Sequence, residues 1–262
     1  MPKNTERFTK EPFPKIRRAT IGVLRAAKRK NMIHSFLELD ISMARETLRR
    51  MKRERKGYIS FLGYIIYCVS RAVDENKIMH AYKNTKNQLI LFDDVDVSTT
   101  IERQLNNRKE VVAKIIRGAN NKSLTEISME IERERSGKIN DAEVFRSMKL
   151  FISLPGFLHQ IVFAILDKFP LLMKKRAGTV MVTSANMVGK GAAWGLPIAT
   201  HTLNITLGGI VERIIEKNGR FEKTEHLCLT LSFDHDIIDG APAARFVRKL
   251  KNIISDCEPV NI

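Results

Sequence analysis

One segment near the C-terminus, residues 229–240, constrains the fold more than any other part of the chain. Large apolar side chains at positions 229, 231 and 233 alternate with smaller or polar ones, which is the pattern of a half-buried strand. Asp239 and Gly240 form a typical turn pair. Apolar residues then recur at helical spacing from 241 to 254, with a proline that the first helical turn tolerates. The segment therefore predicts a strand, a sharp turn and a helix, with His235 where the strand ends.

His235 is a candidate general base. An imidazole titrates near neutral pH, so it can accept a proton from a nucleophile and return it to a leaving group. A lone histidine is more often a satisfied core or surface residue, and Asp239 in a turn is more often a simple cap. The residues around His235 decide between these interpretations.

The stretch 231–246 resembles the active-site signature of the CoA-dependent acyltransferases. That superfamily includes the catalytic core of the 2-oxoacid dehydrogenase complexes and its relative chloramphenicol acetyltransferase. The similarity extends over most of the chain from Pro12 onward, through residues 13–18, 34–41, 61–73, 89–100, 111–124 and 178–189. It implies an α/β fold of the chloramphenicol acetyltransferase type, a two-layer sandwich with a mixed sheet and packed helices. Residues 13–262 would form this single catalytic domain, after a flexible N-terminal arm at 1–12.

The resemblance also implies a chemistry and a set of site residues. An acyl group would move between CoA and a thiol or other nucleophile such as dihydrolipoamide, with acyl-CoA as substrate and no metal. His235 would be the base, and Thr183 or Ser184 would donate a hydrogen bond to the carbonyl oxygen as it becomes negative. Alignment favours Thr183, but a slip of one residue would exchange the two faces of the strand. Asp239 and Gly240 would hold the turn, with Arg17 as the partner of Asp239.

Several features limit what the resemblance transfers. The family commonly has an arginine where this chain has Asp236, and an Asn-Leu-Gly run where this chain has 184–186. We expect no lipoyl group on this chain, because no lipoyl domain precedes the core. The acceptor would then be a separate lipoylated domain or a small molecule.

An apolar helical segment at about 143–175 resembles an insertion, which could form core, an interface between copies, or the wall of an acyl channel. Charged residues and prolines interrupt it, so we expect no membrane span.

The family places its active site between chains, with the histidine from one and the hydroxyl from the next. We therefore expect a homotrimer or a higher multiple. A non-catalytic trimeric scaffold of the same fold is the main alternative, although it would need neither His235 nor a hydroxyl at 183 or 184. A metal site formed by residues 234–236 is disfavoured, because adjacent side chains on a strand point to opposite faces.

The chain is strongly basic, with 45 Lys and Arg against 29 Asp and Glu. Residues 1–60 carry 17 basic and 6 acidic side chains and so contribute +11 of the net +16. Such a charge suits nucleic acid, an anionic membrane or the phosphates of CoA. No nucleic-acid motif accompanies it, so we expect solvated helix faces and no nucleic-acid partner. Three cysteines without paired spacing and no visible secretory signal predict a cytoplasmic protein.

Overall fold

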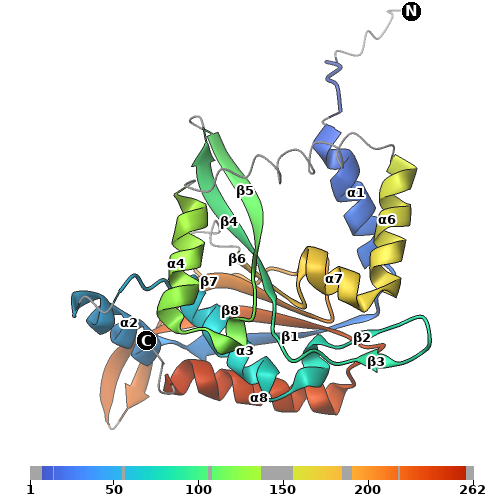
Figure 1. The fold of residues 1–262 in the computed structure, drawn as a ribbon. Helices are drawn as coiled ribbons and strands as arrows, with labels where there is room; N and C mark the ends of the chain where they lie inside the picture. The colour runs from blue at the N-terminus through green and yellow to red at the C-terminus, as the bar shows by residue number, and fades with distance from the viewer. Residues whose placement is uncertain are drawn as a thin grey trace, which may run out of the picture.

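A six-stranded sheet in the order β1-β8-β7-β6-β4-β5 forms the centre of the molecule (Figure 1). The structure is a computed structural model that describes residues 8–13, 15–54, 57–105, 108–136, 156–184, 191–217 and 219–257. β6 pairs in parallel with β4 and with β7, and all other neighbours are antiparallel, so the sheet is mixed. Its strands are β1 (Met32–Asp40), β4 (Val97–Leu105), β5 (Arg108–Ile116), β6 (Val180–Ser184), β7 (Leu203–Lys217) and β8 (Arg220–Asp234).

Helices pack on one face of the sheet, and two more lie beside it. α3 and α8 lie side by side along that face, while α1 and α6 lie together at the right of the view (Figure 1). The helices are α1 (Lys15–Ala27), α2 (Ser42–Arg53), α3 (Phe61–Asp74), α4 (Leu124–Arg135), α6 (Gly156–Lys168), α7 (Pro170–Ala177) and α8 (Gly240–Asp256). Two 3-10 turns, η1 (Lys77–His80) and η2 (Ala119–Asn121), and a small ribbon of β2 (Tyr82–Lys83) and β3 (Leu89–Ile90) complete the described elements.

The main core lies between the sheet and the α3–α8 layer. α3 is buried along nearly its whole length and begins at Ser60, whose hydroxyl accepts a hydrogen bond from the Gly63 N–H at 3.0 Å. The Tyr64 hydroxyl donates to the carbonyl of Ile254 at 2.8 Å and ties α3 to α8. Apolar residues of β4, β6, β7 and β8 complete this core. The sheet is therefore a rigid frame for any side chain at a strand end.

A long hairpin of β7 and β8 sets the register around the site. Its turn contains Gly219, whose φ of +73° lies in the left-handed region that glycine adopts without strain. Pairing then runs from Lys217 opposite Arg220 to Leu203 opposite Phe233, with a bulge between Leu207 and Ile210. The sequence predicts this hairpin from the Asn-Gly pair at 218–219, of which residue 218 lies outside the described residues.

The mixed sheet with packed helices is confirmed, and two details of the prediction are wrong. The sequence predicts one strand over 87–99, but the structure has the short β3, a turn and then β4. Asp93 and Asp94 occupy that turn and pair with Lys77 and Lys174 at 2.5 and 3.3 Å. The apolar stretch ending near 174 divides into α6 and α7 at Pro170, which occupies the first turn of α7 where its missing N–H costs nothing. The sequence also predicts a break in this helical stretch at Pro155, which lies with residues 143–154 outside the described residues.

Candidate active site

The turn that carries His235 is fixed by backbone hydrogen bonds. The Asp234 N–H donates to the Thr202 carbonyl at 2.9 Å, which anchors the end of β8 to the chain entering β7. The His235 N–H donates to the Asn31 carbonyl at 2.6 Å. The imidazole itself is 45% exposed. The backbone of His235 is therefore fixed, while its imidazole ring is accessible to a reacting molecule.

The two carboxylates that flank His235 are bonded to the segment that precedes β1. Asp234 is buried, and one of its carboxylate oxygens lies 2.6 Å from the Lys30 ammonium. The Asn31 side-chain amide donates to the Asp236 carboxylate at 2.9 Å. Lys30 and Asn31 therefore clamp the turn from outside. The sequence analysis did not identify this clamp, because nothing local links residues 30 and 31 to residues about 200 positions away.

Asp239 lies next to the imidazole. Its carboxylate is 3.9 Å from His235 Nδ1, and the residue stands just before α8 without capping that helix through its side chain. The structure does not bring Arg17 and Asp239 together. Arg17 is an exposed residue of α1, and no ion pair joins these two described residues. Asp239 therefore lies beside the imidazole ring that it would orient. Gly240 is the first residue of α8.

The two candidate hydroxyls lie on opposite faces of β6, because successive strand residues alternate. The Thr183 hydroxyl lies 3.2 Å from the Thr206 hydroxyl of the adjacent β7. Ser184 lines a cavity on the side of α3. Both side chains are only partly buried. Each hydroxyl is therefore placed on a rigid strand with access to solvent.

His235 and these hydroxyls are far apart within one chain. Val180 lies beside Leu203, and Leu203 lies opposite Phe233. His235 is two residues beyond Phe233 in one direction, and Thr183 is three residues beyond Val180 in the other. Five residues of extended strand correspond to roughly 16 Å, with two strand spacings sideways in addition. The two groups cannot act on one carbonyl within a single copy.

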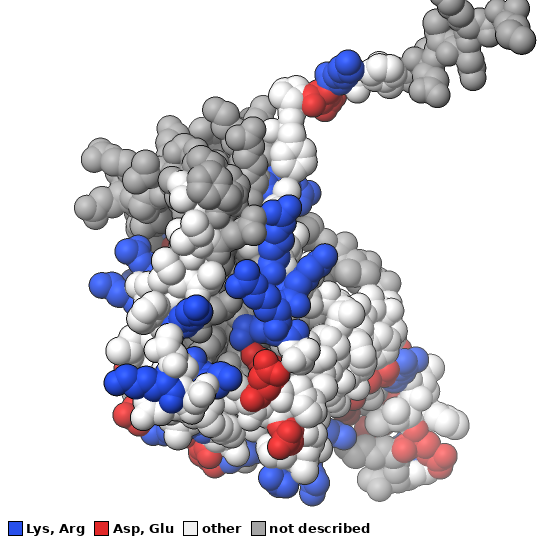
Figure 2. Space-filling model, turned by 90° about the vertical axis from the view of Figure 1, so that its right-hand side faces the viewer, with Lys and Arg blue, Asp and Glu red and all other residues white. Residues whose placement is uncertain are grey.

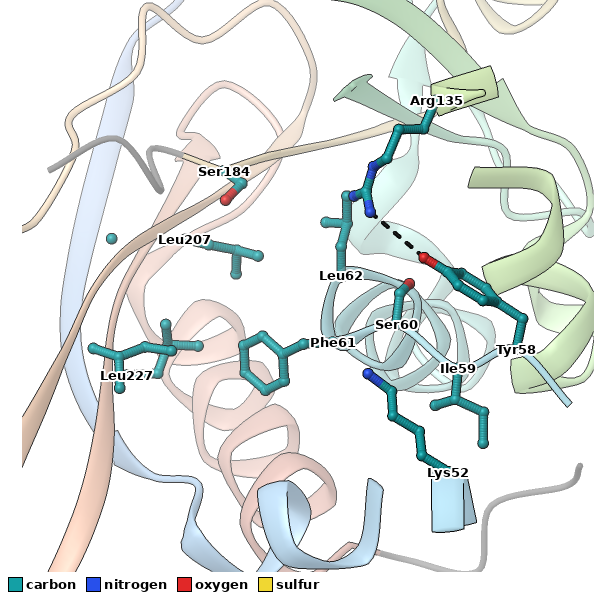
Figure 3. Close-up of a pocket in the computed structure, with 12 residues that line it drawn as sticks. Lys52, Tyr58, Ile59, Ser60, Phe61, Leu62, Arg135, Ser184, Leu207 and Leu227 are labelled. Atoms are coloured by element: carbon teal, nitrogen blue, oxygen red, sulfur yellow. Dashed lines mark hydrogen bonds between the residues drawn. The ribbon is translucent and has the colours of Figure 1, made fainter. Parts of the chain in front are cut away.

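The cavity beside Ser184 has a volume of about 220 Å³ and carries two cationic side chains (Figure 3). Lys52 reaches it from the end of α2, and Arg135 from the end of α4, where its guanidinium donates to the Tyr58 hydroxyl at 3.5 Å. Burial, and the neighbouring Glu132 carboxylate in second place, raise the pKa of Tyr58 above its ordinary value. Phe61 and Leu227 form an apolar part of the cavity wall. The sequence gives no sign of this cavity, because the basic run at residues 49–56 is typical of the solvated end of a helix.

A loop crosses the sheet beside the hydroxyls. The Gly209 N–H donates to the Ala193 carbonyl at 2.8 Å, and the Trp194 indole donates to the Leu37 carbonyl at 3.0 Å. A Cβ added at Gly208 would lie 2.0 Å from the Ala193 carbonyl oxygen. Only a glycine therefore allows the loop to approach β7 this closely.

Two other histidines are buried and structural. His80 bonds to the Thr179 hydroxyl and the Phe92 carbonyl, and His201 to the Thr200 hydroxyl and the Ala177 carbonyl. Burial lowers the pKa of each to about 4, so both are neutral at pH 7. The part of the chain that the structure describes contains no group of three or more metal-ligating side chains. It also contains no helix long and apolar enough to cross a membrane.

Comparison with known families gives a match over most of the chain. A family model described as 2-oxoacid dehydrogenases acyltransferase (catalytic domain) matches residues 5–156 and 173–261. The dihydrolipoyllysine-residue acetyltransferase component of the Bacillus subtilis pyruvate dehydrogenase complex is 22% identical over 265 residues, which cover 93% of this chain and 51% of the relative. The chain thus spans about half the length of the curated relatives that it matches.

Solved structures show the same fold. Dihydrolipoamide acetyltransferase from Azotobacter vinelandii, whose mechanism was examined through a serine, a histidine and an asparagine, has a TM-score of 0.70 at 16% identity, covering 97% of this chain and 94% of that one. The cubic core of a pyruvate dehydrogenase multienzyme complex has a TM-score of 0.69 at 16% identity with the same coverage of both chains. These likenesses confirm the predicted fold class.

Proposed function

The chain belongs to the 2-oxoacid dehydrogenase acyltransferase family, and from that premise we propose that it moves an acyl group between CoA and a thiol acceptor with His235 as general base. One observation carries the assignment of the base. His235 is held by its backbone at a strand end while its ring stays 45% exposed, beside the Asp239 carboxylate. A buried structural histidine, such as His80 or His201, has neither property.

The proton transfer follows from this geometry. Asp239 lies on the Nδ1 side of the ring, which favours the tautomer with the proton on Nδ1 and leaves Nε2 to act as the base. Nε2 takes the proton of the acceptor thiol, whose thiolate attacks the thioester carbonyl carbon. The carbon–sulfur bond to CoA then breaks, and His235 returns the proton to the departing CoA thiolate. No redox partner is required.

We propose Thr183 as the oxyanion donor and keep Ser184 as its rival. The serine and histidine studied in the Azotobacter enzyme stand as far apart in that sequence as Thr183 and His235 do here, and its histidine and asparagine as far apart as His235 and Asp239. A positioned hydroxyl donor of this kind contributes about 3 kcal/mol to transition-state stabilisation. The hydroxyl of Thr206, at 3.2 Å, supports the orientation of Thr183.

A complete site then needs two copies of the chain, since roughly 16 Å of strand separates the base from the hydroxyl. We propose a homotrimer or a multiple of it, with each site formed by His235 of one copy and Thr183 of the next. Cyclic closure of one repeated interface provides this arrangement. The cubic core to which the fold is similar has three-fold axes by its symmetry, which supports the same proposal.

The cavity beside Ser184 supports coenzyme A as the substrate, and because it lies on the face of β6 opposite Thr183, a thioester carbonyl held in it would take its hydrogen bond from Ser184. CoA is anionic, and the Lys52 ammonium and Arg135 guanidinium offer two cations, with the Tyr58 hydroxyl as a neutral hydrogen-bond partner. The departures at residues 184–186 and at Asp236 leave the acyl group open. The acceptor on this proposal is a separate lipoylated domain or a small thiol, and the three free cysteines support a cytoplasmic location.

The direct test is an exchange assay with purified protein, a panel of acyl-CoAs and candidate thiols, including free dihydrolipoamide, followed by CoA release. His235→Ala should lower turnover about 10² to 10⁴-fold with the assembly intact. Thr183→Ala should lower kcat with little change in KM, because the donor acts on charge that is present only in the transition state. Ser184→Ala tests the rival donor, and it should be nearly silent in kcat if Thr183 is the donor. Wild-type turnover by His235→Ala with every active donor would exclude this mechanism and favour the non-catalytic scaffold.

A further inference from the structure

Helix α6 and the turn into α7 expose large apolar side chains to solvent. Ile161, Ile165 and Phe169 are 49%, 42% and 52% exposed, and Leu171 is 73% exposed. The first three are spaced by four residues, so they form one stripe along the outer side of α6 and its end. This stripe together with Leu171 is called the α6 apolar edge below.

Other parts of α6 are already packed. α6 lies against α1, and Leu166 packs against the small cluster of Tyr82, Phe92 and Met173. A helix that is apolar all round is normally covered on all sides. The family model leaves residues 157–172 unmatched, which is most of α6 and the turn that follows it. The α6 apolar edge therefore belongs to a part of this chain outside the matched acyltransferase machinery.

Basic residues border this edge. Lys168, Lys175 and Arg176 are exposed on α6 and α7. The neighbouring α1 and the residues that follow it add four more exposed basic side chains, Arg17, Arg25, Lys28 and Arg29. Figure 2 views this side of the molecule and shows Lys and Arg gathered in a band on it. None of these seven basic side chains forms an ion pair with another residue in the described ranges. The band is therefore free to interact with an external anion.

We propose that the α6 apolar edge and its basic border bind the surface of an anionic lipid bilayer, with α6 lying in the interface. Bulky apolar residues enter the boundary between head groups and acyl chains while lysines and arginines contact the anionic head groups. α6 has 13 residues, about 20 Å of helix, which is too short to span the hydrocarbon core. A two-fold contact between copies fits this surface less well, because it would bring the two basic borders together. The repeated contact of a trimer joins two different surfaces, and the assembly mass measured in the test below separates it from vesicle binding.

The test uses the full chain and flotation with vesicles of phosphatidylcholine, with and without phosphatidylglycerol. Wild-type protein should float with the anionic vesicles, remain behind with the neutral ones, and lose binding as salt is raised. Phe169→Ser combined with Leu171→Ser should weaken binding roughly tenfold or more, since both side chains lose their burial in the interface. Lys168→Gln, Lys175→Gln and Arg176→Gln should each weaken it by about fivefold.

The matched control replaces two apolar residues elsewhere that are more exposed than Phe169 and Leu171. Ile214 and Phe221 lie near the tip of the β7–β8 hairpin and are 76% and 81% exposed. Ile214→Ser with Phe221→Ser should leave vesicle binding unchanged. CoA-dependent exchange by the Phe169 and Leu171 variant serves as a check of its fold, because neither residue belongs to the site. Equal binding of all variants, no preference for anionic vesicles, or a smaller assembly mass without vesicle binding would overturn the proposal. The last of these results would assign the edge to contacts between copies.

Discussion

A shared active site predicts a specific recovery of activity when two inactive variants are mixed. His235→Ala removes the base and Thr183→Ala removes the donor, so each variant alone has no complete site. The strand register separates the two groups by roughly 16 Å within one copy, and this separation is far beyond hydrogen-bond reach. If the site is formed between neighbouring copies, a mixed trimer regains a site wherever a Thr183→Ala copy supplies its intact His235 to a His235→Ala neighbour that supplies Thr183.

The size of the recovery follows from counting. In trimers assembled at random from equal amounts of the two variants, each site draws its base from one copy and its donor from the next. The chance that both are intact is one half times one half, so about one quarter of the wild-type turnover should return. A site contained in one chain has no such combination and should recover nothing above the residual rates.

The assay co-expresses the two variants with different affinity tags, purifies the mixed assembly through both tags and follows CoA release with the best acyl donor. Selection through both tags removes unmixed trimers, so the recovery in that sample should exceed about one quarter and reach about one third. A mixture of the two variants purified separately and never reassembled is the control. A mixed assembly as inactive as its parents would refute the shared site, provided that the wild type carrying both tags remains active.

Other predictions test the frame around the site. Lys30→Met should lower the free energy of unfolding by about 2 kcal/mol, because it leaves the carboxylate of Asp234 buried without its cation, and denaturant titration measures the loss. Gly208→Ala should cost at least about 2 kcal/mol and reduce turnover, since its Cβ would lie 2.0 Å from a backbone oxygen of the adjacent loop. Burial lowers the pKa of His80 and His201 to about 4, while an unfolded histidine titrates near 6.5, so stability is lost as pH falls from 6.5 toward 4. Between pH 7 and 5 this should amount to about 2 kcal/mol per histidine, and stability that rises over this interval as pH falls would contradict it.

The sequence predicted the elements of the site better than their arrangement. The order strand, turn and helix around His235 is confirmed, because alternation, turn residues and helical periodicity are local signals. The β7–β8 hairpin is confirmed for the same reason. The strand predicted over 87–99 was wrong, because the Asn120 side chain bonds to the Val95 N–H and the Asp93 carbonyl and so holds a turn there. Partners distant in sequence leave no periodicity for sequence reasoning to detect.

The clamp of Lys30 and Asn31 and the cavity lined by Lys52, Tyr58 and Arg135 escaped prediction for a related reason. Each joins segments that are remote in the chain, and each contains basic residues that are typical of a solvated helix face. Only the fold shows that Lys30 pairs with a buried carboxylate while Lys52 and Arg135 line a cavity. The basic residues therefore have different structural roles, and the prediction of solvated helix faces for all of them could not distinguish these roles.

The separation of His235 from Thr183 has a consequence for how activity is controlled. A chain that contains both groups, each on a rigid strand, still lacks a working site until a neighbour binds, because the sheet cannot shorten the 16 Å or so between them. Catalysis on the proposed mechanism is thus linked to association by mass action, and dilution should lower specific activity at the concentration where the assembly dissociates. Acyl exchange that stays constant per chain through that dissociation would show that one copy is sufficient. It would then require a donor other than Thr183 or Ser184 within reach of His235.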